Sequence, residues 1–137
     1  MSSVVHFELP AEDRKRMGDF YNKVFGWKIM MLGEDMGNYT LVQTAETDEQ
    51  GMLKRAGAIN GGFFQKDPKK PMSQYPCLVI GVEDIKASMK AINDAGGKAS
   101  GEPTEIPGYG LYLTFMDTEG NLVSMMQPTK EWQAKTK

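Results

Sequence analysis

The feature that most constrains this chain is an internal repeat, in which the same order of predicted elements occurs twice. A shift of 71 positions (77 − 6) places Glu12-Asp13 on Glu83-Asp84, Gly26 on Gly97 and His6 on Cys77. Few residues are identical between the halves, so the repeat depends on element order and on these anchor positions. We therefore expect two copies of one supersecondary unit, each with an apolar sheet face that must be covered.

The first copy is predicted to be a strand, a helix and three further strands. Residues 4–9 alternate between apolar and polar side chains, as in a half-buried strand. Pro10 and the acidic residues after it suit the first turn of a helix, and Gly26 ends it. Its apolar stripe is Met17, Phe20, Tyr21, Val24 and Phe25. Strands are expected over 27–32, 39–44 and 56–64.

The second copy repeats this order. A strand over 77–82 precedes a helix that Asp84 caps and Gly96-Gly97 ends, with the stripe Ile85, Ser88, Met89, Ile92 and Ala95. A short strand over 98–101, a loop, and strands over 111–116 and 122–127 follow. The predicted class is α+β, with two βαβββ modules forming a curved, mostly antiparallel eight-stranded sheet and helices on its outer face. We expect one domain, 1–137, with module one over 3–65, a linker over 66–74, module two over 75–128 and a polar tail over 129–137.

The composition argues against nucleic-acid and membrane partners. Sixteen Lys and Arg against eighteen Asp and Glu give a net charge of −2, without the basic face of a nucleic-acid-binding module. No apolar run approaches the length of a membrane span, and the N-terminus lacks the pattern of a secretory signal. The single cysteine, Cys77, excludes an internal disulfide. We expect a cytoplasmic protein with neither a nucleic-acid nor a membrane partner.

Several short segments resemble one superfamily. Val5-His6-Phe7-Glu8 and Phe25-Gly26-Trp27 are similar to the opening of vicinal oxygen chelate proteins, which include glyoxalase I, bleomycin resistance proteins and extradiol dioxygenases. Two further segments are similar to the second half of these proteins: Val82-Glu83-Asp84-Ile85 and Phe115-Met116-Asp117-Thr118-Glu119-Gly120-Asn121. The resemblance runs from about Val4 to Gln127 and implies paired βαβββ modules. Superfamily members often form homodimers, which we also expect here.

The resemblance implies one divalent metal, held from the first and the last strand of each module. Those positions fall at His6, near Gly61, at Cys77 and at Ser124. With a single histidine in the chain, the two-histidine, one-carboxylate triad of a dioxygenase cannot form. His6, Glu8 and Cys77 would be a contrived set, and the thiol would first have to ionise. We therefore expect no metal and no other cofactor, and disfavour a divalent metal bound through His6.

The remaining candidates describe a ligand cleft. Ligand pockets are mostly apolar with a few placed polar groups. Tyr39, Gln43 and Gln127 would add polar contacts, and the glycines of Ile106-Pro107-Gly108-Tyr109-Gly110 would let a loop close at the cleft mouth. Cys77 with His6 as its base would be a nucleophile, but a pocket-lining thiol fits the sequence better. The predicted cleft residues are His6, Glu8, Phe63, Cys77, Tyr109, Tyr112, Ser124 and Met126.

Three functions remain open. The first is a metal-independent protein that sequesters a small organic compound, aromatic or planar, as in the bleomycin resistance branch. The alternative is a lyase or isomerase related to glyoxalase I, with an atypical site around His6 and Glu8. The third is a subunit-interaction module with no small ligand. The sequence names no catalytic residue that separates them.

Overall fold

The computed structural model describes residues 1–135 of the 137 and divides them into two compact units. One unit comprises His6–Pro76 and the other Cys77 onward together with Met1–Val5. The strand β1 (Val4–Ala11) therefore begins with the C-terminal unit and continues into the first. The division falls just after the linker expected over 66–74. Each unit is described separately below.

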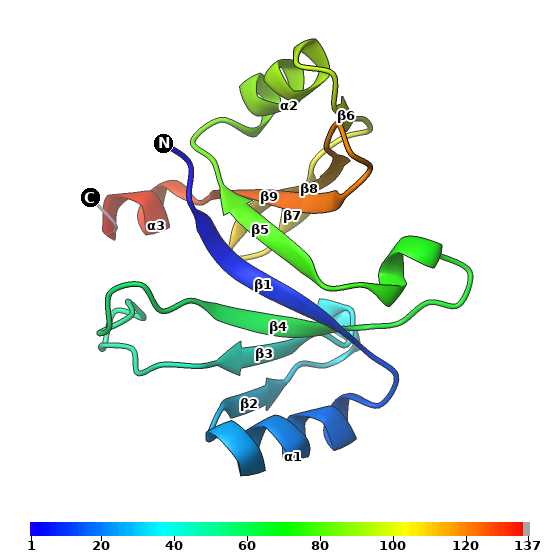
Figure 1. The fold of residues 1–137 in the computed structure, drawn as a ribbon. Coiled ribbons are helices and arrows are strands. Elements are labelled where there is room, and N and C mark those ends of the chain that lie inside the picture. The colour runs from blue at the N-terminus through cyan, green and yellow to red at the C-terminus, as the bar shows by residue number, and fades with distance from the viewer. Residues whose placement is uncertain (136–137) are drawn as a thin grey trace. The chain divides into compact units, whose positions relative to one another are not determined.

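The first unit contains the predicted strand, helix and three strands (Figure 1). Its sheet has the order β2-β3-β4-β1, with β1 parallel to β4 and the other neighbours antiparallel. A single-turn 3-10 helix over Glu34–Met36 joins the second and third strands. The elements are α1 (Arg14–Phe25), β2 (Lys28–Met31), β3 (Thr40–Gln43) and β4 (Asn60–Gln65).

Helix α1 begins later than the sequence predicts. The chain stays extended through Ala11, because β1 continues to pair with β4 up to Gln65. Asp13 then caps the helix, with its carboxylate accepting a hydrogen bond from Arg16 N at 2.9 Å. Gly26, at φ 73°, ends the helix in the left-handed conformation, as expected.

The core of the first unit lies between α1 and one face of the sheet. Of the predicted stripe on α1, Met17 and Tyr21 pack against this core, whereas Phe20, Val24 and Phe25 are more than half exposed. The helix therefore buries a narrower face than its sequence indicates. The core residues of the sheet are Phe7, Leu9, Ala11, Ile29, Val42 and Phe63.

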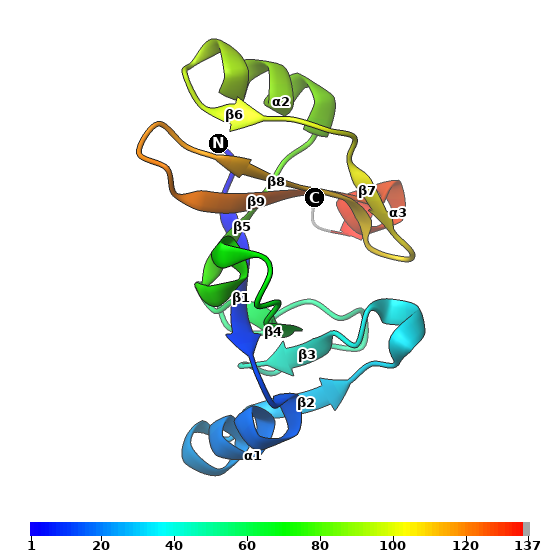
Figure 2. The same cartoon turned by 90° about the vertical axis from the view of Figure 1, so that its right-hand side faces the viewer.

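The second unit repeats the order with one extra strand (Figure 2). Its sheet runs β5-β9-β8-β6, with β5 parallel to β9 and the unexpected β7 pairing with β8. Residues 1–135 thus contain nine strands and not eight. The elements are β5 (Cys77–Gly81), α2 (Ile85–Asp94), β6 (Lys98–Ala99), β7 (Thr104–Ile106), β8 (Gly110–Met116), β9 (Leu122–Pro128) and α3 (Lys130–Lys135).

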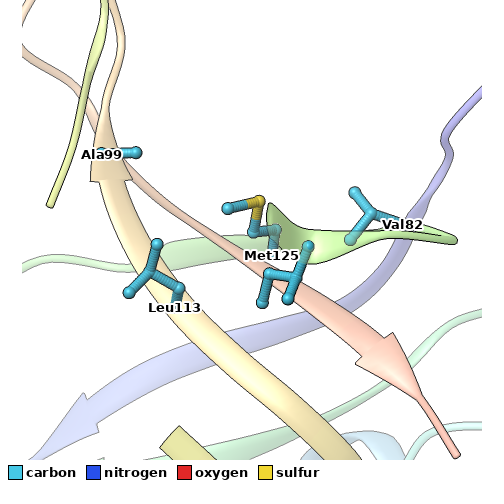
Figure 3. Packing of buried hydrophobic residues seen from close by; sticks show 5 residues of the cluster. Val82, Ala99, Leu113 and Met125 are labelled. Carbon is cyan, nitrogen blue, oxygen red and sulfur yellow. The ribbon is translucent and has the colours of Figure 1, made fainter. Parts of the chain in front are cut away.

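Helix α2 covers one face of this sheet, as its stripe predicts. Ile85, Met89 and Ile92 pack with the buried residues Val82, Ala99, Leu113 and Met125. Figure 3 labels these four buried residues. Asp84 caps the helix through a 3.0 Å bond from Ala87 N. The α+β class and the two βαβββ modules are confirmed, with a helix on one face of each sheet.

The turn between β8 and β9 explains the motif that ends in Gly120-Asn121. Asp117 Oδ1 accepts hydrogen bonds from the backbone amides of Glu119 and Asn121, both at 2.9 Å. Asn121 Nδ2 donates to the other carboxylate oxygen at 2.9 Å, and Gly120 supplies the positive φ of 80°. Hydrogen bonding to the carboxylate lowers the pKa of Asp117. The motif therefore specifies a tight turn and is not a candidate site.

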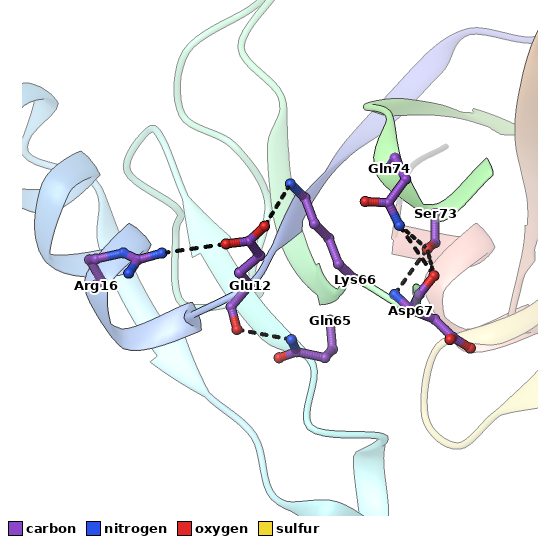
Figure 4. A network of polar contacts seen from close by, with 7 residues as sticks. All are labelled: Glu12, Arg16, Gln65, Lys66, Asp67, Ser73 and Gln74. Atoms are coloured by element: carbon purple, nitrogen blue, oxygen red, sulfur yellow. Dashed lines mark hydrogen bonds and ion pairs between the residues drawn. The ribbon is translucent and has the colours of Figure 1, made fainter. Parts of the chain in front are cut away.

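The expected linker is an ordered segment with a 3-10 helix over Pro71–Gln74. Ser73 Oγ accepts from Asp67 N at 3.0 Å, and Gln74 Nε2 donates to Asp67 O at 3.2 Å (Figure 4). The expected polar tail over 129–137 begins with α3, and Thr136-Lys137 lie outside the described residues. Across residues 1–135, no helix combines the length and the apolar composition that crossing a membrane requires.

Replacing Phe63 with alanine tests the core of the first unit. Its ring is 0% exposed, so Phe63→Ala should lower the free energy of unfolding by about 3–5 kcal/mol in a urea titration. Phe20→Ala is the matched control, because that ring is 55% exposed and its loss should cost less than about 1 kcal/mol. Equal losses for the two variants would contradict this placement of the core.

Candidate functional site

His6 and Glu8 lie on the face of the first sheet that is turned away from α1. Their neighbours Phe7, Leu9 and Ala11 pack in the α1 core, and side chains alternate between the two faces of a strand. The alternation that predicted a half-buried strand therefore also sets the histidine and the carboxylate on one surface. Both residues lie in the expected positions on β1.

Tyr39 connects these two side chains. His6 Nε2 is 2.9 Å from Tyr39 Oη, and the same hydroxyl donates to Glu8 Oε2 at 2.9 Å. The histidine and tyrosine rings are stacked, with centroids 6.5 Å apart. Glu8 is only 8% exposed, and a buried carboxylate requires such hydrogen-bond donors. His6, Tyr39 and Glu8 form a continuous polar group, which we call the histidine relay.

Strand β4 leaves room for Tyr39 because it carries two consecutive glycines. The parallel register pairs Phe7 with Gly61 and Glu8 with Gly62. A Cβ on Gly61 would overlap the Phe7 ring, and a Cβ on Gly62 would overlap the Tyr39 ring. Glycine in a strand often marks such close approaches. Gly61 thus faces the core, and Gly62 lies beneath the histidine relay.

The environment favours neutral His6. Burial lowers the pKa of His6 below its ordinary value of 6.5, while the charge of Glu8 acts in the opposite direction and is the smaller effect. At neutral pH the imidazole therefore carries no charge and is able to accept a proton. The adjacent carboxylate favours the imidazolium that would result.

The second unit places four other side chains together. Ser124 Oγ is 2.6 Å from Tyr112 Oη, 3.1 Å from Thr114 Oγ1 and 3.3 Å from Cys77 Sγ. Ser124 is fully buried at the centre of this group, which we call the hydroxyl cluster. Its members are neutral hydroxyls and one thiol, so the group offers hydrogen bonds and no charge.

The other predicted site residues are placed differently. Met126 pairs with Tyr112 across β8 and β9 and is partly buried, whereas Tyr109 is 44% exposed in the turn before β8. Phe63 lies wholly inside the α1 core, with its ring centroid 5.6 Å from that of Tyr21. Phe63 is therefore a core residue and not a ligand-facing one, because it shares the core face of β4 with Gly61.

The residues at the implied metal positions do not form a ligand set for a divalent metal. His6 is bonded to Tyr39, Gly61 brings no side-chain donor atom, and the buried hydroxyl of Ser124 is surrounded by two hydroxyls and the Cys77 thiol. Among residues 1–135, no group of three or more His, Cys, Asp and Glu side chains could hold a metal ion. A serine hydroxyl and glycines lack the imidazole and carboxylate ligands that zinc sites use.

A shallow groove of about 510 Å³ opens elsewhere on the first unit, beside the start of α1. Glu12 lies within 3.9 Å of Arg16 and 3.7 Å of Lys66, and Gln65 Nε2 donates to Glu12 O (Figure 4). The groove is lined by Glu12, Asp13, Arg16 and Lys66 among others, and it contains none of the predicted site residues.

Comparisons with known proteins give the family. The family model "Glyoxalase/Bleomycin resistance protein/Dioxygenase superfamily" matches residues 3–125. A glyoxylase-like domain-containing protein of Didymella fabae is 30% identical over 115 residues, covering 83% of this chain and 84% of that protein. A probable lactoylglutathione lyase of Vibrio cholerae is 28% identical over 126 residues, covering 90% and 89%. The chain belongs to the glyoxalase/bleomycin resistance protein/dioxygenase superfamily.

Solved structures agree on the fold. Methylmalonyl-CoA epimerase from Mycobacterium tuberculosis matches with a TM-score of 0.68 at 14% identity, covering 96% of this chain and 91% of that one. A Streptomyces coelicolor methylmalonyl-CoA epimerase variant in complex with 2-nitronate-propionyl-CoA has a TM-score of 0.69 at 14% identity, covering 95% and 96%. At this level of identity, the similarity concerns the fold alone.

The single histidine makes the electrostatics of the relay directly measurable. An NMR titration of His6 should give a pKa below 6.5, because burial outweighs the charge of Glu8. Glu8→Gln should lower that pKa further, since it removes the negative charge that favours the imidazolium. Glu12→Gln, on the exposed surface of the same unit, should leave the titration unchanged. A rise of the pKa in Glu8→Gln would contradict the assigned geometry.

Proposed function

We propose that this protein is a lyase or isomerase that acts on a small carbonyl compound and uses His6 to move a proton. The observation that supports this most directly is the histidine relay, in which a buried, neutral imidazole is hydrogen-bonded to Tyr39 and through it to Glu8. A general base works best when its pKa lies near the operating pH. The alternative with a site around His6 and Glu8 is thus the better supported one.

The proposed step needs no metal. His6 would take the proton from the carbon next to a carbonyl, and the electron pair of the C–H bond would move onto the carbonyl oxygen to give an enolate. The carboxylate of Glu8 stabilises the imidazolium formed in this step. Transfer of a proton from water to the opposite face of the same carbon re-forms the C–H bond and the carbonyl, the imidazolium returns its proton to water, and the substrate is epimerised.

The names of similar proteins support this substrate class. Three related proteins carry the name lactoylglutathione lyase, two of them as probable, and the structurally similar proteins are methylmalonyl-CoA epimerases. Lactoylglutathione and methylmalonyl-CoA both carry a thioester carbonyl beside a carbon that bears a proton. We propose a compound of this kind as the substrate, bound by a cytoplasmic homodimer.

A second candidate is metal-independent binding of a small organic ligand without turnover. The hydroxyl cluster favours it, because Ser124, Tyr112 and Thr114 offer uncharged hydrogen-bonding groups and no acid or base. Cys77, Tyr109, Tyr112, Ser124 and Met126 would then contact the ligand directly or support the residues that do.

Deuterium exchange distinguishes the two candidates. The protein is incubated in D₂O with S-lactoylglutathione or methylmalonyl-CoA, and loss of the proton next to the carbonyl is followed by NMR. We expect the protein to accelerate exchange on at least one of these probes. His6→Gln should slow that exchange by about 100-fold or more, which is the usual contribution of a general base.

The matched control is Lys15→Gln, at an exposed position of α1 in the same unit, which should exchange like the wild type. Retention of the full rate in His6→Gln would overturn the role of the histidine. Failure of the wild type to accelerate exchange on either probe would reject the proposed enzyme. Binding of a probe without exchange, measured by calorimetry, would instead support the second candidate.

A further inference from the structure

The number of protons in the histidine relay fixes the direction of its hydrogen bonds. Tyr39 has one hydroxyl proton, which it donates to Glu8 Oε2 at 2.9 Å. Its oxygen must therefore accept the bond from His6 Nε2, also at 2.9 Å. A neutral imidazole carries one ring proton, so that proton lies on Nε2. Nδ1 is left with its lone pair and has no hydrogen-bond partner among residues 1–135.

We infer that Tyr39 is a positioning residue that holds His6 in the Nε2–H tautomer and makes Nδ1 the atom that accepts the substrate's proton. The role of Nδ1 rests on the proposed function, whereas the tautomer itself does not. The hydrogen bonds that the ring nitrogens of a histidine make determine which of them carries the proton. Tyr39 thereby defines which atom of His6 reacts.

Three contacts hold Tyr39 in the position that this role requires. Its ring covers Gly62, where any side chain would overlap the phenol. Arg14 Nη1, from α1, donates to the backbone oxygen of Tyr39 at 3.4 Å and to Thr40 Oγ1 at 3.3 Å. His6 Nε2 bonds to the hydroxyl itself at 2.9 Å, and the imidazole ring is inclined by 22° to the ring of Tyr39. Helix, glycine and histidine together leave the hydroxyl little freedom to turn elsewhere.

Two substitutions distinguish the effect of the Tyr39 hydroxyl from the effect of the ring position over Gly62. Tyr39→Phe keeps a ring over Gly62 and removes only the oxygen that accepts from His6. Gly62→Ala keeps that oxygen but displaces the ring, because the new Cβ would overlap it. Both substitutions should weaken the preference of His6 for the Nε2–H tautomer. Tyr39→Phe does so by removing the acceptor oxygen, and Gly62→Ala does so by moving it. Tyr21→Phe is the matched control, since Tyr21 lies in the same unit and its hydroxyl makes no hydrogen bond within residues 1–135.

Nitrogen NMR of the ¹⁵N-labelled protein reads the tautomer directly, because His6 is the single histidine of the chain. The spectrum is recorded at a pH above the titration of His6. In the wild type and in Tyr21→Phe, we expect Nε2 to show the shift of a protonated ring nitrogen and Nδ1 that of an unprotonated one. In Tyr39→Phe and Gly62→Ala, both shifts should move toward the average of the two tautomers.

Each outcome either supports or overturns the inferred role of Tyr39. A wild-type spectrum with the proton on Nδ1, or with averaged shifts, would overturn it, and this measurement requires no variant to fold. An unchanged spectrum in a folded Tyr39→Phe would overturn the positioning role. If the spectra are as expected but the protein does not accelerate exchange on either thioester probe, the tautomer assignment holds and the proposed function fails. The expected spectra with slowed exchange in Tyr39→Phe would support both.

Discussion

The close packing of two aromatic rings on Gly61 and Gly62 is the constraint on which the candidate site of this protein depends. The two glycines are adjacent in β4, so they face opposite sides of the first sheet. Phe7 covers Gly61 on the core side, and Tyr39 covers Gly62 on the other side. The same strand thus completes the core beneath α1 and leaves space for the phenol that joins His6 to Glu8.

This arrangement also accounts for the lack of a metal-ligand set. In the position where the superfamily resemblance implies a ligand, β4 has glycine, and the neighbouring space is filled by Tyr39. The second unit has hydroxyls around Ser124 in the corresponding place. Around Gly62 and Ser124 the chain thus has hydrogen-bonding groups and not charged ligands. Among the predicted site residues, His6 is a base that is neutral at pH 7 and is linked through Tyr39 to the carboxylate of Glu8.

Much of this architecture is predictable from the sequence, because strand and helix periods are local properties. The alternation of residues 4–9 places His6 and Glu8 on one face, and Asp84 marks the start of α2. The run Gly61-Gly62-Phe63-Phe64 has no alternation, so the sequence alone does not show that Phe63 faces the core. Tyr39 was identified only as a polar contact, because its place over Gly62 depends on pairing between β3 and β4. Such pairing register involves residues 19 to 23 positions apart and leaves no local signal.

The central claim is that neutral His6 is the proton acceptor, and the pH dependence of exchange on the more reactive thioester probe tests it most directly. A base must be unprotonated to act, so the exchange rate should rise with pH through one ionisation and then level off. The account predicts that the midpoint of this rise coincides with the NMR titration of His6, which lies below 6.5. A rate that is unchanged across the titration of His6 would contradict the account.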